Sequence, residues 1–265
     1  MASEQTGTTD RGRVVVVTGG AKGIGAGISR AFLAAGDTVV TCGRTPVDDL
    51  PAADGRTAEF RPCDVRDPEA VAALVDEVVA THGRLDVLVN NAGGSPPTDA
   101  ATASPRFIAS IIDLNLTAPF VCAQAANAVM QQQDAGGVIV NIASVSGLRA
   151  SPGTAAYGAA KAGLVNLTRT LAVEWAPKVR VVAVTPGLVL TEQAEEFYGD
   201  GSVRAAVEAT VPLGRFGSPD DIGAACTWFA SDAAGYATGS NLVLDGGGEW
   251  PAFLTAAERA RGEAT

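Results

Sequence analysis

The sequence has few of the residues that mark several common classes of protein. Only 18% of its residues are charged and 5% are aromatic, whereas 47% are hydrophobic, so the chain is too apolar for a disordered protein. Its continuous apolar runs, such as residues 14–17 and 138–140, have the length of strands. A membrane-spanning helix needs about 18 consecutive apolar residues. We therefore expect a folded protein that neither crosses nor anchors in a membrane.

Basic residues are also scarce, with 19 Lys and Arg against 29 Asp and Glu and a formal net charge of −10. Nucleic acids and anionic membranes attract clustered cations, so we expect neither as a partner. The four cysteines form no CxxC pair, and His82 is the single histidine, so no metal site is predicted. No secretory signal pattern opens the chain. We expect reduced cysteines and a cytoplasmic location.

Short β-branched runs alternate with longer alanine-rich stretches. Strands are predicted at residues 14–17, 38–42, 59–63, 86–89, 138–142, 179–184 and 241–244, and helices at 23–35, 68–82, 106–132, 154–175 and 219–230. Apolar strands that alternate with helices are typical of a parallel sheet covered on both faces. We predict a single-domain α/β protein with a doubly wound (Rossmann) seven-stranded parallel sheet over 13–248. A flexible tail (1–12) would precede it and an extension (249–265) would follow it.

A glycine-rich turn joins the first predicted strand to the first predicted helix. Residues 18–25 read T-G-G-A-K-G-I-G. Glycines let the backbone approach a pyrophosphate, and the helix N-terminus offers free N–H groups to it. The alternative is a tight turn without a ligand. The next strand ends at Arg44 with no carboxylate for the ribose of NAD. Arg44 and Lys22 favour the 2′-phosphate of NADP(H), unless both are only solvated surface charges.

A tyrosine and a lysine share one face of a predicted helix. Tyr157 and Lys161 are four residues apart, so both side chains point to the same side. An unperturbed phenol has a pKa of about 10, and we expect the ammonium to lower it by a few units. Ser144 lies at the end of the preceding strand, where its hydroxyl would bond a substrate oxygen. The alternatives are packing roles for the pair and a turn role for Ser144.

Six motifs occur in order along the chain. They are T-G-x-x-x-G-I-G at 18–25, N-N-A-G at 90–93, an asparagine in a long helix at 115, a serine at 144, Y-x-x-x-K at 157–161 and P-G-x-x-x-T at 186–191. Together they resemble the short-chain dehydrogenase/reductase family, with the 3-oxoacyl-carrier-protein reductases as the most similar subgroup. The resemblance spans residues 12 to 248. It implies an enzyme that transfers a hydride between a nicotinamide cofactor and a ketone or secondary alcohol.

The resemblance also implies a role for each motif residue. Tyr157 would be the general acid or base, and Lys161 would lower its pKa and bind the nicotinamide ribose. Ser144 would hold the substrate oxygen, and Asn115 would anchor a water that relays protons. The cofactor residues would be Gly19, Lys22, Gly23, Ile24, Gly25, Arg44, Asp64, Val65, Asn91, Ala92, Gly93, Tyr157, Lys161, Pro186, Gly187, Val189 and Thr191. Asp64 would contact the adenine, with a turn or cap role as the alternative.

Substrate choice is expected to depend on residues 94–103, 148–153 and 188–213, the last of which contains Phe197, Tyr198 and Val203. An acidic carrier protein needs a basic docking site, but residues 131–134 read Q-Q-Q-D at the expected place. A free ketone, or an acyl-CoA as the alternative, is therefore favoured over a carrier-bound substrate. The alternatives are an NAD-linked alcohol dehydrogenase, a 3-oxoacyl thioester reductase and, outside enzymes, a non-catalytic nucleotide-sensing protein.

The resemblance further implies a homotetramer in which helices 106–132 and 154–175 pair between subunits. The extension carries Trp250, Phe253 and Leu254. We expect these apolar side chains to pack on a neighbouring subunit near its residues 188–213. A frayed tail is the alternative.

Overall fold

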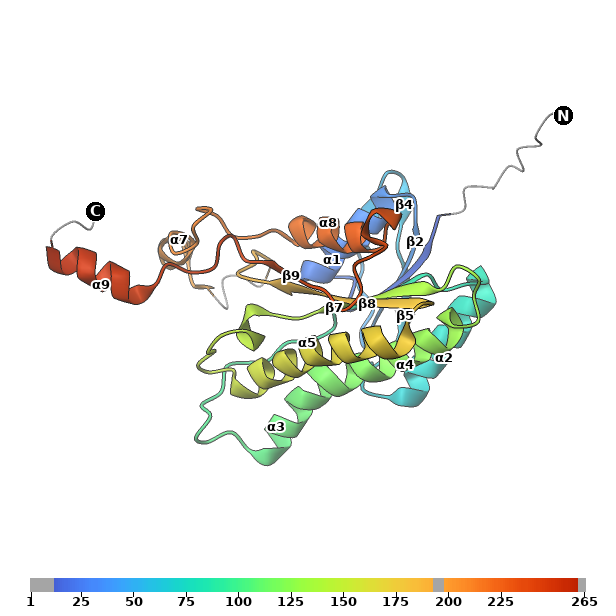
Figure 1. The fold of residues 1–265 in the computed structure, drawn as a ribbon, viewed down its shortest axis with the longest axis horizontal. Coiled ribbons are helices and arrows are strands. Elements are labelled where there is room, and N and C mark those ends of the chain that lie inside the picture. Colours follow the sequence, from blue (N-terminus) through green and yellow to red (C-terminus); the bar gives the residue numbers. More distant parts are fainter. Residues whose placement is uncertain (1–11, 193–197, 262–265) are drawn as a thin grey trace.

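The computed structural model describes residues 12–192 and 198–261, and a seven-stranded parallel sheet lies at its centre (Figure 1). The strands are β1 (Val14–Thr18), β2 (Thr38–Gly43), β5 (Glu59–Pro62), β6 (Val87–Asn90), β7 (Gly137–Ile142), β8 (Val179–Pro186) and β9 (Asn241–Leu244). Their order in the sheet is β5-β2-β1-β6-β7-β8-β9. The predicted doubly wound sheet is confirmed. Its strand order reverses beside β1, the point at which such sheets bind ligands.

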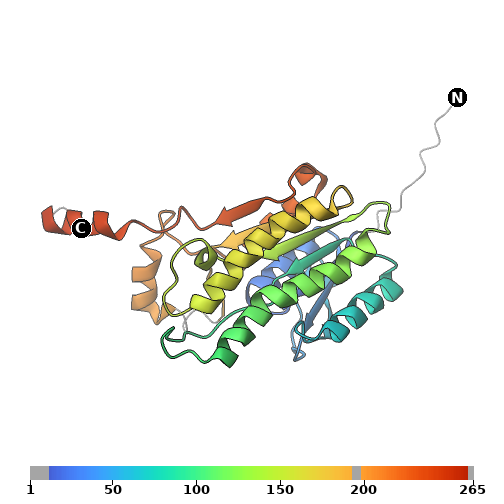
Figure 2. The ribbon, with the colours of Figure 1, turned by 60° about the horizontal axis from the view of Figure 1, so that its bottom comes forward.

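Helices cover both faces of the sheet (Figures 1 and 2). On one face lie α1 (Gly23–Ala34) and α8 (Pro219–Phe229), which pack against each other. On the other face lie α2 (Pro68–His82), α4 (Ala118–Met130) and α5 (Ala155–Trp175). The chain runs outward from β1 to β5 and then back through β6, β7 and β8, so right-handed crossovers place α1 on one face and α2, α4 and α5 on the other.

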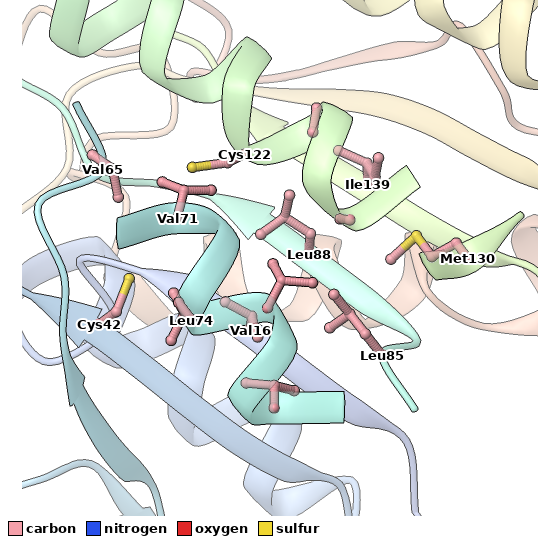
Figure 3. Close-up of a cluster of buried hydrophobic side chains, with 14 of the residues drawn as sticks. Val16, Cys42, Val65, Val71, Leu74, Leu85, Leu88, Cys122, Met130 and Ile139 are labelled. Carbon is pink, nitrogen blue, oxygen red and sulfur yellow. The ribbon is translucent and has the colours of Figure 1, made fainter. Parts of the chain in front are cut away.

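Each face of the sheet has its own apolar core. Figure 3 shows the core beneath α2 and α4, where Val16 and Leu88 from the strands meet Leu74 and Met130 from the helices. The next residue of β1, Val17, belongs to the core on the opposite face. Successive side chains of a strand point to opposite faces, so a strand between two cores must be apolar at every position. This explains the uninterrupted run of valines in β1.

The helix predicted over 106–132 is not one regular α-helix. Helix α3 (Pro105–Ile112) passes into a π-helical turn, η1 (Asp113–Thr117), before α4 continues. Such turns are rare and occur mostly at functional sites, and this one carries Asn115. The run Pro105–Met130 is long and apolar enough to cross a membrane by length and composition alone, with a mean hydropathy of 1.4. In the fold, its Cys122 and Ala126 pack into the core against the sheet.

Several elements lie outside the predicted pattern. A small hairpin joins β3 (Ala52–Ala53) to β4 (Arg56–Thr57) through Asp54 and Gly55. Helix α7 (Gly201–Glu208) and helix α9 (Ala252–Arg261) follow later in the chain, and α9 projects away from the body of the molecule in both ribbon views (Figures 1 and 2). All four cysteines are buried and free, as predicted for reduced thiols. Most of the predicted N-terminal tail and Phe197 lie outside the described residues.

Candidate active site

A cleft of about 760 Å³ opens at the carboxyl ends of the parallel strands. The glycine-rich turn forms one end of its wall, and the segments that follow β2, β5, β6, β7 and β8 form the rest. Ser144, Tyr157, Lys161 and every predicted cofactor residue line this cleft. Among the predicted site residues, Asn115 alone does not line it. The topology of the sheet thus brings together segments that are distant in the sequence.

The predicted chemical residues meet at one end of the cleft. Tyr157 and Lys161 project from the first two turns of α5, and the Tyr157 hydroxyl forms a hydrogen bond with Ser144, which follows β7. Lys161 Nζ donates to the carbonyl of Ile142 over 2.7 Å and lies 5.6 Å from the centre of the Tyr157 ring. The phenol, the serine hydroxyl and the amine therefore form one compact group.

Burial dominates the protonation of this group. It raises the pKa of Tyr157, and the hydrogen bond with Ser144 opposes that rise. Burial also lowers the pKa of Lys161 to about 8. The expectation that Lys161 would bring the pKa of the phenol below its ordinary value is wrong for this structure. The spacing of the two residues along the helix does not reveal how far burial removes water from them. This desolvation has the larger effect on the pKa of Tyr157.

Asn115 lies directly behind the cleft, in the π-helical turn. Its Oδ1 accepts from Gly94 N–H, and its Nδ2 donates to the carbonyls of Gly94 and Ile111, each over 2.9 Å. A Cβ atom on Gly93 would lie 2.6 Å from Asn115 Oδ1 and 3.3 Å from Lys161 Nζ. Only glycine therefore lets Asn115 fix the loop after β6 so closely against Lys161. The proton relay through Asn115 stays a prediction.

The glycine-rich turn is held tightly against the segment after β6. Asn91 Nδ2 donates to the carbonyls of Thr18 and Gly19 over 2.9 and 3.2 Å. A Cβ atom on Gly25 would lie 2.2 Å from the Gly19 carbonyl oxygen, so this turn has no room for a side chain there. Asn91 thus braces the turn.

The N-terminus of α1 binds a carboxylate within the molecule. Gly23 N–H donates to Glu192 Oε1 over 2.9 Å, and this bond lowers the pKa of Glu192. Free N–H groups and the helix dipole at such a position favour an anion. Lys22 and Arg44 are exposed at the same cleft. This donor set and the close backbone of the turn fit the pyrophosphate of a nicotinamide dinucleotide.

Asp64 has a local partner that sequence reasoning missed. Its carboxylate forms an ion pair with Arg66 over 2.6 Å, and this interaction lowers the pKa of Asp64 to about 2. The cap of helix α2 is Asp67, whose side chain accepts from the N–H groups of Glu69 and Ala70. Asp64 therefore stabilises the turn before the helix. Its contact with adenine stays a prediction.

Tyr198 adds a second phenol to the cleft. Its ring packs against Phe216 at a tilt of 34°, with centroids 4.9 Å apart, and its hydroxyl hydrogen-bonds to the backbone of Val189. It lies close enough to Tyr157 to contribute to the raised pKa of that residue. From the sequence, Tyr198 is predicted only as one residue of the segment 188–213, on which substrate choice is expected to depend. Among the described residues, no group of three or more His, Cys, Asp or Glu side chains could hold a metal ion.

Comparisons with known proteins agree with this geometry. The family described as enoyl-(acyl carrier protein) reductase matches residues 19–249. A 3beta-hydroxysteroid dehydrogenase of Eggerthella lenta is 38% identical over 89% of this chain and 94% of its own length. A 3-oxoacyl-[acyl-carrier-protein] reductase of Chlamydia muridarum is 34% identical over 89% of this chain and 96% of its own.

Solved structures give the same result. The aldohexose dehydrogenase of Thermoplasma acidophilum superposes with a TM-score of 0.81 at 30% identity, covering 89% of this chain and 94% of that one. These matches extend over nearly the whole length of each protein. The chain therefore belongs to the short-chain dehydrogenase/reductase family, whose members are oxidoreductases that use a nicotinamide cofactor.

Proposed function

We propose that this enzyme interconverts a ketone and a secondary alcohol with NADP(H), and that Tyr157 is its general acid and base. The observation that carries the proposal is the buried group of Ser144, Tyr157 and Lys161, which shares one cleft with the glycine-rich turn. A bound nicotinamide would supply or accept the hydride. The residues of this chain would orient the substrate and move the proton.

In the proposed mechanism each of these groups has its own part in the reaction. The Ser144 hydroxyl holds the substrate oxygen beside the Tyr157 hydroxyl, and Tyr157 donates its proton to that oxygen during reduction. The raised pKa of Tyr157 keeps the phenol protonated at neutral pH. The Lys161 amine, fixed by Ile142, supplies a positive charge that favours the phenolate left after the transfer.

The preference for NADP(H) rests on two exposed cations at the nucleotide end of the cleft. Arg44 follows β2 and Lys22 lies within the glycine-rich turn. An arginine in this position accommodates a 2′-phosphate, whereas an acidic residue would bind the 2′-hydroxyl of NAD.

Two substitutions test the proposal. Tyr157→Phe should lower kcat for ketone reduction by about 10²- to 10⁴-fold and leave the Kd for NADPH nearly unchanged. Arg44→Asp should reverse the preference between NADPH and NADH, measured by fluorescence titration. If a broad ketone panel gives no NADPH oxidation and Tyr157→Phe changes nothing, the non-catalytic nucleotide-sensing alternative would replace this proposal.

A free carbonyl substrate fits this surface better than an acyl group on an acidic carrier protein. Gln133 donates to the carbonyls of Leu85 and Gly136, and Lys178 donates to the carbonyl of Gln133. The residues in the docking position thus fulfil structural roles and add no cluster of positive charge. We also propose a homotetramer, formed through α4 and α5, and a cytoplasmic location, which suits the four free cysteines.

A further inference from the structure

A second, smaller cavity of about 200 Å³ lies next to the cleft. The two share Ser95 and Thr154 in their walls, so the small cavity lies beside the end of the cleft that contains the chemical group. Thr154 is three residues before Tyr157, about 4.5 Å along a helix axis. An arm of a substrate held by Tyr157 would therefore reach this cavity past Ser95 and Thr154.

The wall of the small cavity is mostly apolar, and its polar side chains are the hydroxyls of Ser95, Thr98 and Thr154. Its side chains include Ala100, Ala103, Phe107, Ile108, Ala155 and Ala156, and no charged side chain of the described residues lines it. Such a wall offers no opposite charge to a charged group, whose burial without a partner is costly.

The shape of the cavity is fixed by a backbone contact. Thr98 N–H donates to the carbonyl of Gly153 over 2.8 Å, which joins the loop after β6 to the segment before α5. At the outer end, Ile108 is 41% exposed. The cavity is thus bounded near the chemical group and reaches the protein surface beyond Ile108.

We propose that this cavity, the apolar subsite, takes an uncharged hydrocarbon arm of the substrate. An apolar cavity of about 150 Å³ holds a benzene molecule, so the subsite fits an arm of about six to eight carbons, straight or cyclic. The inference rests on the proposed function and narrows its substrate class to ketones and secondary alcohols with one such arm. Each methylene that enters the subsite should raise kcat/KM about fourfold.

A series of methyl ketones from 2-butanone to 2-undecanone tests the proposal with NADPH as the reductant. We expect kcat/KM to rise with chain length and to level off once the arm reaches Ile108, because later carbons stay in water. A flat profile, or a preference for ketones with a carboxylate at the end of the arm, would overturn the apolar subsite.

Two matched substitutions locate the effect. Ala103 lines the subsite, whereas Ala101 is exposed in the same loop and does not. Ala103→Phe should lower kcat/KM for 2-octanone at least tenfold and change kcat/KM for 2-butanone by no more than about twofold. The control, Ala101→Phe, should leave kcat/KM for both ketones unchanged. Ile108→Ala, which opens the outer end, should move the plateau to a different chain length. Equal losses on short and long ketones in Ala103→Phe would contradict the proposal.

A binding measurement separates this inference from the proposed function. Saturation-transfer NMR with 2-octanone measures binding of its alkyl chain to the subsite and requires no turnover. If no ketone is reduced but the alkyl protons of 2-octanone receive saturation in the wild type and not in Ala103→Phe, the subsite stands and the proposed reaction fails. If ketones are reduced and no such difference is seen, the subsite fails alone.

Discussion

Burial and hydrogen bonding act in opposite directions on the hydroxyl of Tyr157. Burial is the stronger influence and raises its pKa, and the bond with Ser144 lowers it. The phenol therefore carries its proton at neutral pH, the form that can donate to a carbonyl oxygen. The reverse transfer, from an alcohol, needs the phenolate. If Tyr157 acts as proposed, reduction should be favoured near neutral pH and oxidation under alkaline conditions.

Lys161 makes stability depend on pH in a defined direction. Its pKa is about 8 in the folded protein, against an ordinary value of 10.5. Between pH 8 and 10.5 the unfolded chain holds a proton on this amine that the folded protein has released. The free energy of unfolding therefore increases with pH over this range. Relative to Lys161→Met, the wild type should become more stable by at most about 3 kcal/mol between pH 8 and 10.5.

Urea unfolding of both proteins from pH 7 to 10 measures this difference. The variant also loses the bond to the Ile142 carbonyl, but that loss does not change with pH. The slope of the difference therefore reports the amine. A difference that stays constant over the range would show that Lys161 titrates normally.

Glu192 should compete with the proposed cofactor. Its carboxylate occupies Gly23 N–H at the N-terminus of α1, where the pyrophosphate would bind. Removing this negative charge by Glu192→Gln should tighten NADPH binding roughly fivefold, since two unit charges about 4 Å apart in water repel by about 1 kcal/mol. Glu174→Gln, on the exposed end of α5, is the matched control. Weaker binding in Glu192→Gln, measured by fluorescence titration, would refute this competition.

At the level of elements, a buried polar chain joins two strands to two helices. Asn90 on β6 donates to the Pro119 carbonyl on α4 and to Asn141 on β7, and Asn141 donates to Thr168 on α5. These bonds sit immediately below the segment that forms the cleft wall after β6. The chain therefore fixes the spacing of the elements that carry the site.

Breaking this chain should destabilise the whole fold. Asn141→Ala leaves buried donors and acceptors on Asn90 and Thr168 with fewer partners, at a cost of about 1–3 kcal/mol. Asn166→Ala, exposed on α5, should change stability by less than about 0.5 kcal/mol. Urea unfolding at pH 7 compares the two, and equal stability of the variants would disprove a structural role for the chain.

At the scale of the whole molecule, helix α9 and the residues just before it project from the body of the protein (Figures 1 and 2) and expose apolar side chains. Trp250, Phe253 and Leu254 are 53%, 72% and 36% exposed, and Arg149 forms an ion pair with Glu249 at the start of this extension. Apolar side chains grouped on a projecting segment often mark an interaction site. We still predict that these three side chains contact a neighbouring subunit.

Deletion of residues 250–265 tests this contact. We expect a smaller assembly by light scattering or a raised KM, because the neighbour would lose its cover near residues 188–213. Phe253→Ala is a milder variant that should move the same quantities in the same direction. Unchanged mass and unchanged KM in both proteins would mean that the extension is a surface tail.

The periodic pattern of the sequence was sufficient to predict the seven strands. A strand between two cores is apolar on both faces, and the four successive valines of β1, Val14–Val17, show this directly. The hairpin of β3 and β4 has no such pattern, because it consists of two pairs of residues joined by a turn at Asp54, which has a positive φ of 50°. The π-helical turn at Asn115 was also not predictable, since its apolar spacing continues that of the flanking helices.

The sequence by itself determined the fold, the motifs and the place of the cleft, because the order of β-branched runs and glycines fixes which strand ends meet. Only the tertiary structure decided how strongly each group is buried, and burial governs the charge on Tyr157 and Lys161. It also paired Glu192 with Gly23 and opened the apolar subsite beside Thr154. These contacts join residues far apart in the chain, and local spacing carries no information on such distances.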